Sequence, residues 1–399
     1  MVTSEWRGPH KSVDVLIVGA GPVGLAAAVT LSRRGKKVRI VDAAPRGSST
    51  SRAAVVHART LEVLHTIGMA APLVEEGVIV PDFTVRNGAR TLARLDFRGL
   101  RTPYPFTLMI PQVRTEELLH ATLVELGGEV EREVEFDTFA RPAAPAPAGR
   151  GQVAVLRHAD GTLEKVAARF VIGADGSRSR VREHQGIPFE GLEYAASFVL
   201  ADVRLSWSLP GDEVQLFFSK QGLVVVAPLP GGRHRIVATM DEAPAQPTVG
   251  DVRHILDERG PGGAVVDSLV WSSRFRVAHR LAAVFRTGAV FLAGVAAHVH
   301  SPAGGQGMNL GLQDAVFLGG LLADVLAGER GEEALADYER LRRPAARSVI
   351  ALTDRMTRMA TLRDPVLRGL RDRAIRVALH SPRRQAALAR RIAQLDTAS

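Results

Sequence analysis

The chain of 399 residues contains no cysteine, and only 5% of its residues are aromatic. The absence of cysteine excludes disulfide bonds, thiolate metal sites and thiol nucleophiles, and it agrees with a reducing cytoplasm, where we expect the protein to work. Long uninterrupted apolar runs are also missing. The most apolar stretch, residues 15–31, contains Gly19, Gly21 and Pro22, so we expect neither a signal peptide nor a membrane span.

Basic residues outnumber acidic residues by 51 to 42, and the formal net charge is +9. Such a balance is compatible with nucleic-acid binding, but the sequence contains no nucleic-acid motif and few aromatic residues that could stack on bases. We therefore favour a solvated, arginine-rich helical surface or attraction of an anionic ligand, and we expect no nucleic-acid partner. Hydrophobic residues make up 46% of the chain, which is enough for a globular core.

Residues 13–42 carry the strongest local pattern. A β-branched apolar run leads into Gly19-Ala20-Gly21-Pro22-Val23-Gly24, a helical pattern follows, and a second apolar run ends at Asp42. In this G-x-G-x-x-G spacing the first glycine permits a tight turn, the second lets a pyrophosphate approach the backbone, and the third lets helix and strand pack closely. The acid at the end of the second strand is placed to accept ribose hydroxyls. The pattern predicts an adenine dinucleotide site. The alternative is an ordinary βαβ unit whose glycines serve packing alone.

The remaining chain predicts an α/β fold interrupted by a second sheet. We expect a Rossmann-like domain with a parallel sheet at 1–185, including a small antiparallel sheet at 78–107, and a second part of this domain at 276–345. Short β-type runs separated by Pro and Gly turns predict an inserted β-sheet domain at 186–275. C-terminal helices are expected at 346–399, with the helical region after residue 332 broken at Pro344, Pro365 and Pro382.

Two further stretches follow buried strands. Asp175-Gly176 is followed by Arg178, Ser179 and Arg182, and residues 302–309 read Pro-Ala-Gly-Gly-Gln-Gly-Met-Asn. With these motifs in order, the chain resembles the single-component FAD-dependent aromatic hydroxylases, the p-hydroxybenzoate hydroxylase-like flavoprotein monooxygenases. Within them it is most similar to bacterial aromatic-polyketide hydroxylases. We expect it to be without the thioredoxin-like C-terminal domain that these hydroxylases often carry, since the sequence stops about where that domain would begin.

The resemblance assigns the site residues. It implies that the adenine dinucleotide is FAD, so that the Rossmann-like domain is an FAD-binding domain. Arg52 would reach the pyrophosphate, Gln112 would lie beside the flavin, and the Val134 backbone would lie at the adenine. The helix that follows residues 302–309 would offer its first N–H groups to the flavin pyrimidine, where they stabilise negative charge. The implied catalytic residues are Pro302, Gly307 and Met308. The implied cofactor-binding residues are Gly19, Gly21, Pro22, Val23, Gly24, Asp42, Arg52, Gln112, Val134, Asp175, Gly176, Gly294, Val295, Gly305, Gln306, Gly307, Met308 and Asn309.

Val295 departs from the family pattern, which places an aspartate at this position to accept a hydrogen bond from a ribityl hydroxyl. Valine cannot accept, and losing such a bond costs about 0.5–1.5 kcal/mol. We therefore expect FAD binding to be weakened rather than abolished. His298 and His300 could share a strand face, but no carboxylate or cysteine accompanies them in the sequence, and we predict no metal site.

The resemblance implies an FAD-dependent monooxygenase. NAD(P)H would act as a transient co-substrate, and a C4a-hydroperoxyflavin formed with molecular oxygen would hydroxylate an aromatic or polyketide-like substrate. Aromatic residues of the inserted sheet could line the substrate pocket, although core positions are the commoner interpretation; they are Phe198, Trp207, Phe217, Phe218 and Trp271. Two alternatives stay open: a non-redox flavin-binding cyclase of polyketide biosynthesis, and an accessory hydroxylase subunit with a weakened flavin site.

Overall fold

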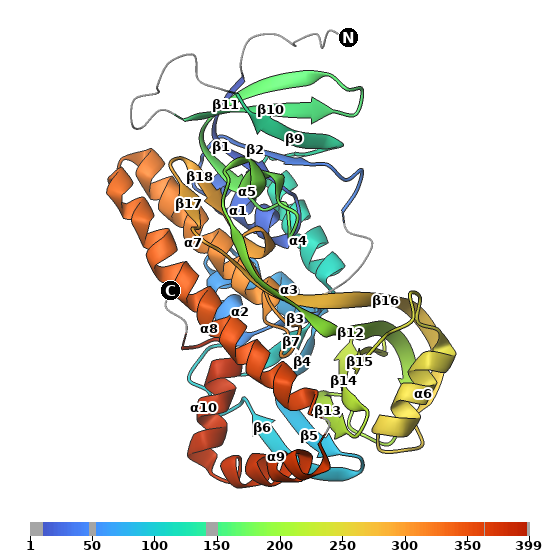
Figure 1. The fold of residues 1–399 in the computed structure, drawn as a ribbon. Helices are drawn as coiled ribbons and strands as arrows, with labels where there is room; N and C mark the ends of the chain where they lie inside the picture. Colours follow the sequence, from blue (N-terminus) through green and yellow to red (C-terminus); the bar gives the residue numbers. More distant parts are fainter. Residues whose placement is uncertain (1–10, 48–52, 141–150, 363, 397–399) are drawn as a thin grey trace.

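The computed structural model describes residues 11–47, 53–140, 151–362 and 364–396. Arg52 and the Pro/Ala-rich segment 141–150 therefore lie outside the described residues. Figure 1 shows two large sheets joined by long strands, with helices packed along the first sheet and around the far end of the second. This arrangement confirms the expected mixed α/β fold.

The first sheet holds the predicted parallel strands. Its strands are β1 (Lys11–Val18), β2 (Val38–Asp42), β8 (Val130–Arg132), β9 (Val134–Phe139), β10 (Gln152–His158), β11 (Leu163–Gly173), β17 (Arg286–Thr287) and β18 (Val290–Leu292). The order is β17-β18-β11-β1-β2-β8, and the five strands from β18 to β8 run parallel. Strand β10 extends the sheet as the antiparallel neighbour of β11, and β9 pairs antiparallel with β10. The carboxyl ends of β18, β11, β1 and β2 consequently lie side by side.

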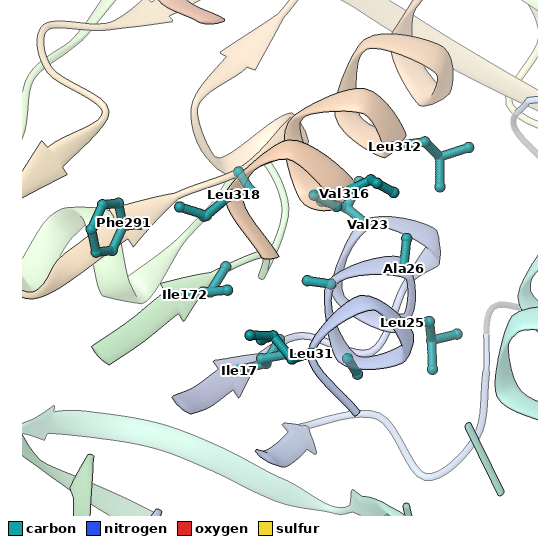
Figure 2. Close-up of a cluster of buried hydrophobic side chains, with 14 of the residues drawn as sticks. Ile17, Val23, Leu25, Ala26, Leu31, Ile172, Phe291, Leu312, Val316 and Leu318 are labelled. Atoms are coloured by element: carbon teal, nitrogen blue, oxygen red, sulfur yellow. The ribbon is translucent and has the colours of Figure 1, made fainter. Parts of the chain in front are cut away.

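Two helices cover one face of this sheet: α1 (Pro22–Arg33) and α7 (Gly307–Ala327). In Figure 2, Ile17 of the sheet lies near Leu31 of α1, and Ile172 lies on the side of Leu318 of α7. All four side chains are fully buried. Apolar residues at helical spacing form this face because only burial against a second apolar surface removes them from water. The core holds the glycine turn after β1 rigidly in place.

Helix α7 is long and apolar enough to cross a membrane by length and composition alone. In the described part of the chain it is the one helix with this property, and 72% of its most apolar 18-residue window is buried inside the protein. Burial of this extent is typical of the core helix of a globular protein, so α7 does not indicate a membrane span.

The second sheet forms the other half of the molecule. Its strands are β5 (Asp82–Asn87), β6 (Arg90–Asp96), β12 (Phe189–Ser206), β13 (Glu213–Ser219), β14 (Gly222–Leu229), β15 (Arg233–Met240), β16 (Val265–Ala282) and β19 (His298–Val299), in the order β19-β16-β12-β15-β14-β13-β5-β6. Helix α6 (Val249–Arg259) packs its Val252, Ile255 and Leu256 against one face. Strand β16 runs through the expected boundary at 275, and the division into domains stays a prediction.

The segment 78–107 was expected to form one small antiparallel sheet, and the structure divides it between two sheets. Strands β4 (Val78–Val80) and β7 (Thr107–Met109) pair antiparallel, with β3 (Val55–Val56) on the other side of β7. The hairpin of β5 and β6 instead joins the second sheet, because β5 pairs in parallel with β13. This pairing spans about 130 residues of sequence, so local patterns do not predict it.

The helices between the strands and at the C-terminus complete the fold. They are α2 (Ala58–His65), α3 (Ala70–Glu76), α4 (Gln112–Glu125), α5 (Arg180–His184), the 3₁₀ turns η1 (Gly294–Ala296) and η2 (Glu332–Leu335), α8 (Ala336–Ala360), α9 (Pro365–Ala378) and α10 (Pro382–Ile392). Pro365 and Pro382 begin helices as expected, but the predicted break at Pro344 is wrong, because α8 continues through it. Buried Tyr338 and Val349 anchor α8 on both sides of this proline, and their packing outweighs one missing backbone hydrogen bond.

Candidate cofactor-binding site

The turn between β1 and α1 leaves open space at one glycine and none at the other two. A Cβ on Gly19 would lie 2.4 Å from the carbonyl oxygen of Ala174, and one on Gly24 would lie 1.8 Å from the carbonyl oxygen of Gly19. Among the described residues, no atom lies within 4 Å of a Cβ built on Gly21. Gly21 is also the residue before the first turn of α1, where backbone N–H groups lack helical partners. The open side of the turn is therefore suited to an anionic group.

A cleft of about 630 Å³ opens beside this turn. It combines the start of α1 with the ends of β2 and β8 and the start of α4. Its volume lies within the range usual for small-molecule sites. The residues that line it are Ala20, Gly21, Pro22, Asp42, Ala44, Pro45, Arg46, Gly47, Gln112, Glu116 and Arg132.

Asp42 lies at the end of β2, as the sequence predicts, and its carboxylate contacts the protein backbone. Oδ2 accepts a hydrogen bond from the Ala20 N–H at 2.6 Å, and Oδ1 accepts one from the Ala44 N–H at 2.8 Å. These bonds fix the two loops that border the cleft. Each carboxylate oxygen has a second lone pair, so both remain able to accept from a ligand hydroxyl.

Arg132 lines the cleft and was not predicted from the sequence. It ends β8, directly across from Asp42 in the parallel pairing of β2 with β8. Within the described residues its one ion-pair contact is to Asp42 Oδ2, at 3.8 Å, which is too long for a hydrogen bond. A guanidinium with uncommitted N–H groups at the rim of the cleft favours an anionic or oxygen-rich ligand. The sequence feature that could have identified Arg132 is its position, as a basic residue, at the end of a strand.

Gln112 lies at the first position of α4. Its Oε1 accepts from the Ala53 N–H at 3.2 Å, and its Nε2 donates to Glu116 Oε1 at 2.8 Å. The side chain thus ties the start of α4 to the segment that follows β2. Val134, assigned to the adenine, begins β9 and is 5% exposed.

Asp175 and Gly176 follow β11 and lie next to the glycine turn, since a Cβ on Gly19 would be 2.8 Å from the Asp175 nitrogen. Asp175 Oδ2 accepts from the Val181 N–H at 3.2 Å. Its Oδ1 is buried and has no hydrogen-bond partner among the described residues. Burial raises the pKa of Asp175, although hydrogen bonds partly offset this effect. A buried oxygen without a donor is unfavourable, so the position fits a ligand hydroxyl or an ordered water.

Arg182 connects this motif to the loop after β18. Its guanidinium donates to the carbonyl oxygens of Ala296, at 2.9 Å, and Ser177, at 3.0 Å. It also lies 3.9 Å above the ring of Phe189, a favourable cation–π contact. The neighbouring Val295 is on η1, and 40% of it is exposed. Arg182 therefore fixes the backbone that presents Val295.

Val23 and Gly294 serve the packing of α1 against α7. A Cβ on Gly294 would lie 2.7 Å from Val23 Cγ2, and one on Gly311 would lie at the same distance from that atom. Gly294 also has a positive φ of 60°, which favours glycine. The side chain of Val23 thus fills the space between two glycines and does not line the cleft.

The octapeptide at 302–309 shapes the start of α7 through side chains that face the protein. The Gln306 amide donates to the carbonyl oxygens of Gly304, at 3.0 Å, and Ile392, at 3.1 Å. Asn309 accepts from the His57 N–H at 2.7 Å and donates to the Val55 carbonyl oxygen at 2.8 Å. These two side chains are therefore committed to the fold. The first backbone N–H groups of α7, at Gly307 and Met308, are the part of the octapeptide that can meet a ligand.

Two buried imidazoles hold this loop, and sequence analysis gave neither a role. His57 Nε2 lies 2.8 Å from the Gly304 carbonyl oxygen, and His300 Nδ1 lies 2.9 Å from the Ser301 carbonyl oxygen. Burial lowers the pKa of each to about 4, so both are neutral at pH 7. A neutral imidazole donates to one carbonyl and leaves its other nitrogen as an acceptor. Both residues stabilise the backbone of the loop before α7.

His298 belongs to a buried ionic network beneath the same loop. Its Nε2 lies 2.6 Å from Asp314 Oδ2, and Arg342 Nε donates to Asp314 Oδ1 at 2.7 Å. Burial alone would raise the pKa of Asp314, but Arg342 and His298 hold it below its usual value. The structure thus brings to His298 a carboxylate that is distant in sequence. This carboxylate is committed to an arginine, which favours a structural role over metal binding.

The predicted aromatic residues of the second sheet divide into buried phenylalanines and partly buried tryptophans. Phe217 and Trp207 pack together beneath α6, with ring centroids 6.2 Å apart. Phe198 is buried and stacks on Phe275, with centroids 5.3 Å apart. Trp271 is only partly buried. Most of these side chains therefore belong to the core, as the commoner interpretation held.

The three predicted motifs converge at the carboxyl ends of β1, β11 and β18, which are neighbouring strands. Such an edge of an open parallel sheet, with a glycine turn leading into a helix, defines a dinucleotide-binding α/β protein. The family model described as FAD binding domain matches residues 12–353. The chain belongs to this family, and FAD is its cofactor.

The relatives are named monooxygenases. The chain is 42% identical over 368 residues to the 6-methylpretetramide 4-monooxygenase of Streptomyces rimosus, covering 91% of this chain and 64% of the relative. It is 36% identical over 364 residues to the pentachlorophenol 4-monooxygenase of Sphingobium chlorophenolicum, covering 89% and 67%. The chain thus spans about two thirds of the length of these relatives.

Solved structures give the same picture. The p-nitrophenol 4-monooxygenase of Pseudomonas putida DLL-E4 superimposes with a TM-score of 0.85 at 25% identity, covering 98% of this chain and all of the neighbour. An aklavinone-11 hydroxylase in complex with FAD and aklavinone superimposes with a TM-score of 0.77 at 29% identity, covering 89% and 70%. The predicted resemblance to FAD-dependent aromatic hydroxylases is confirmed.

Proposed function

We propose that the protein is an FAD-dependent monooxygenase that uses NAD(P)H and molecular oxygen to hydroxylate an aromatic or polyketide-like substrate in the cytoplasm. The observation that carries the proposal is the convergence of the three motifs on one sheet edge, around a glycine turn with open space at Gly21. The names of the relatives support the substrate class, since they include a pretetramide, a chlorinated phenol, a nitrophenol and aklavinone.

The described residues fit FAD on three independent grounds. The vacant space at Gly21 lies at the N-terminus of α1, which suits a pyrophosphate. The buried Asp175 Oδ1 has no donor in the described part of the chain, which suits a sugar or ribityl hydroxyl. Asp42 and Arg132 lie together at the far side of the cleft, which suits the adenosine ribose and its phosphate.

The chain's own residues then have distinct tasks. The first N–H groups of α1 would hold the pyrophosphate, and those of α7, at Gly307 and Met308, would face the flavin pyrimidine and stabilise negative charge there. His57 and Asn309 fix the loop that aims these N–H groups. When bound, FAD would supply the redox chemistry by which electrons from NAD(P)H activate oxygen for transfer to an aromatic ring. Pro302, in the same loop, is proposed to border the substrate.

Val295 distinguishes this chain within the site. Its side chain is 40% exposed at the edge where Asp175 and the start of α7 also lie, and it offers no acceptor. We propose that FAD is bound without this contact and therefore less tightly. The cyclase alternative is not favoured by the relatives, which are named monooxygenases. The accessory-subunit alternative requires a decayed site, and the intact glycine turn and α7 start speak against it.

The test begins with the purified chain saturated with FAD. A bound flavin spectrum that bleaches on anaerobic addition of NADPH or NADH, and faster with an aromatic ligand such as a nitrophenol or an anthracycline aglycone present, supports the proposal. Bound flavin that neither nicotinamide reduces with any of these ligands present would overturn the monooxygenase and favour the cyclase. Failure to bind FAD at saturation would favour the accessory subunit.

A further inference from the structure

Helix α9 presents an apolar face to solvent. Val366, Leu370 and Val377 are 68%, 59% and 63% exposed, and Leu367 is 49% exposed. Among the described residues, five of the twelve large hydrophobic side chains that are exposed lie between positions 359 and 377. Their spacing puts residues 366, 370 and 377 on one side of the helix. Scattered exposed apolar residues are ordinary, but a cluster on one helix face indicates a binding surface.

The opposite face of α9 is fixed to the protein, so the apolar face is held outward. Arg371 lies 4.4 Å above the ring of Phe218 and donates to the Met359 carbonyl oxygen at 3.1 Å. Asn87 of the β5–β6 hairpin donates to Asp372 at 2.7 Å. These contacts determine which side of the helix faces the core. The exposed apolar residues of α9 therefore face solvent because the other side of the helix is held against the protein.

The outward face is bordered by positive charge. Exposed Arg373 and Arg376 lie on α9 beside the apolar residues, and exposed Arg383 and Arg384 begin the neighbouring α10. The single acid within α9, Asp372, is bonded to Asn87 and Arg371 on the inner side. The surface thus combines aliphatic side chains with uncompensated arginines, which complements an anionic and apolar partner.

A second copy of the chain does not suit this face. A helix of fourteen residues is roughly 21 Å long and about 10 Å wide, so its face covers about 200 Å², against about 800 Å² per partner in a stable interface. A two-fold contact would also bring the arginines of one copy against those of the other. An acidic protein partner would be expected to meet aromatic anchor residues, and this face has none among its described side chains.

We propose that α9 rests on an anionic lipid surface, with its apolar residues entering the boundary between headgroups and acyl chains and its arginines among the lipid phosphates. Helices with this composition lie in the plane of a membrane interface without spanning it. Figure 1 shows α9 at the lower edge of the molecule, where a flat surface can reach it. The proposal is independent of the proposed function, because no residue of the cleft takes part.

The test is co-sedimentation of the full chain, saturated with FAD, with phosphatidylcholine vesicles that contain or lack phosphatidylglycerol. We expect binding to the anionic vesicles that weakens as salt is raised. Leu370→Ser combined with Val377→Ser is expected to weaken binding by about tenfold or more, since two buried aliphatic side chains are lost. Arg373→Gln combined with Arg376→Gln is expected to abolish the preference for phosphatidylglycerol.

The matched controls are Val124→Ser combined with Val270→Ser, which removes residues 53% and 51% exposed on other surfaces, and Arg33→Gln combined with Arg101→Gln. Both control proteins are expected to bind vesicles as the parent does. All variants must retain the parent's thermal midpoint and FAD stoichiometry, which shows that they are folded. Absence of binding, equal binding to neutral vesicles, or a dimer that dissociates on the Leu370→Ser change would each overturn the proposal.

Discussion

Gly21 and Gly24 give a paired prediction, because the structure assigns the two glycines opposite roles. An alanine at position 21 meets no atom of the described chain within 4 Å, and the residue's φ of −78° is open to any amino acid. Gly21→Ala therefore costs the unliganded protein no more than about 1 kcal/mol, the value for a weaker helix-capping residue. An alanine at position 24 places Cβ 1.8 Å from the Gly19 carbonyl oxygen, so backbone must move. We expect a loss of stability of about 3 kcal/mol or more.

Gly21→Ala, which hardly changes the stability of the unliganded protein, should clearly weaken FAD binding. The added methyl group occupies the space where the pyrophosphate approaches α1, and overpacking of this size costs about 1–3 kcal/mol. The dissociation constant of Gly21→Ala should rise about 5- to 150-fold. The assay is quenching of FAD fluorescence on titration with apoprotein, together with the thermal midpoint of the apoprotein. Gly21→Ala that binds FAD like the parent, or that unfolds as readily as Gly24→Ala, would refute the reasoning.

Four further predictions concern the same site and its supports. Val295→Asp restores a carboxylate acceptor and should tighten FAD binding by up to about tenfold, measured by the same titration; unchanged affinity would show that the side chain does not meet the ribityl chain. Arg132→Gln should weaken FAD binding without lowering the thermal midpoint, and a change in the midpoint alone would contradict its role in binding. Asp314→Asn leaves Arg342 buried without its counter-charge and should cost about 3–5 kcal/mol in denaturant unfolding; a loss below about 1 kcal/mol would refute a tightly coupled network. Burial lowers the pKa of His57 from about 6.5 in the unfolded chain to about 4 in the folded protein. Protonation of the unfolded chain therefore removes up to about 3 kcal/mol of stability as pH falls from 6.5 to 4. His57→Gln should flatten this part of the profile of unfolding free energy against pH.

The local sequence predicts those features of the structure that depend on residues close together in the chain. The roles of Gly19 and Gly24 follow from their spacing between a strand and a helix, and the structure gives both the close contacts that the spacing implies. Asp42 likewise lies at a strand end because an apolar run stops there. The parallel sheet and the β-type runs of the second sheet were predictable because apolar runs bounded by turn residues mark strands.

Contacts between distant segments were not predictable in this way. Arg132 reaches the cleft because β8 pairs with β2, about 90 residues earlier, and no local pattern records that pairing. The side chains of Gln306 and Asn309 were assigned to the cofactor, yet they bond to Ile392 and Val55, which only the folded chain brings near. Helix α8 continues through Pro344 because residues on both sides of the proline are packed in the core, and this packing outweighs the missing backbone hydrogen bond.

The central claim is that the chain inserts one atom of molecular oxygen into an aromatic compound. The direct measurement is turnover under ¹⁸O₂ with FAD, NAD(P)H and the panel of aromatic ligands used for flavin reduction, followed by mass spectrometry of the products. The account predicts a hydroxylated product that carries one ¹⁸O atom, formed only with nicotinamide present. NAD(P)H consumed with hydrogen peroxide as the sole oxygen product for every ligand, or a product that takes its oxygen from water, would contradict it.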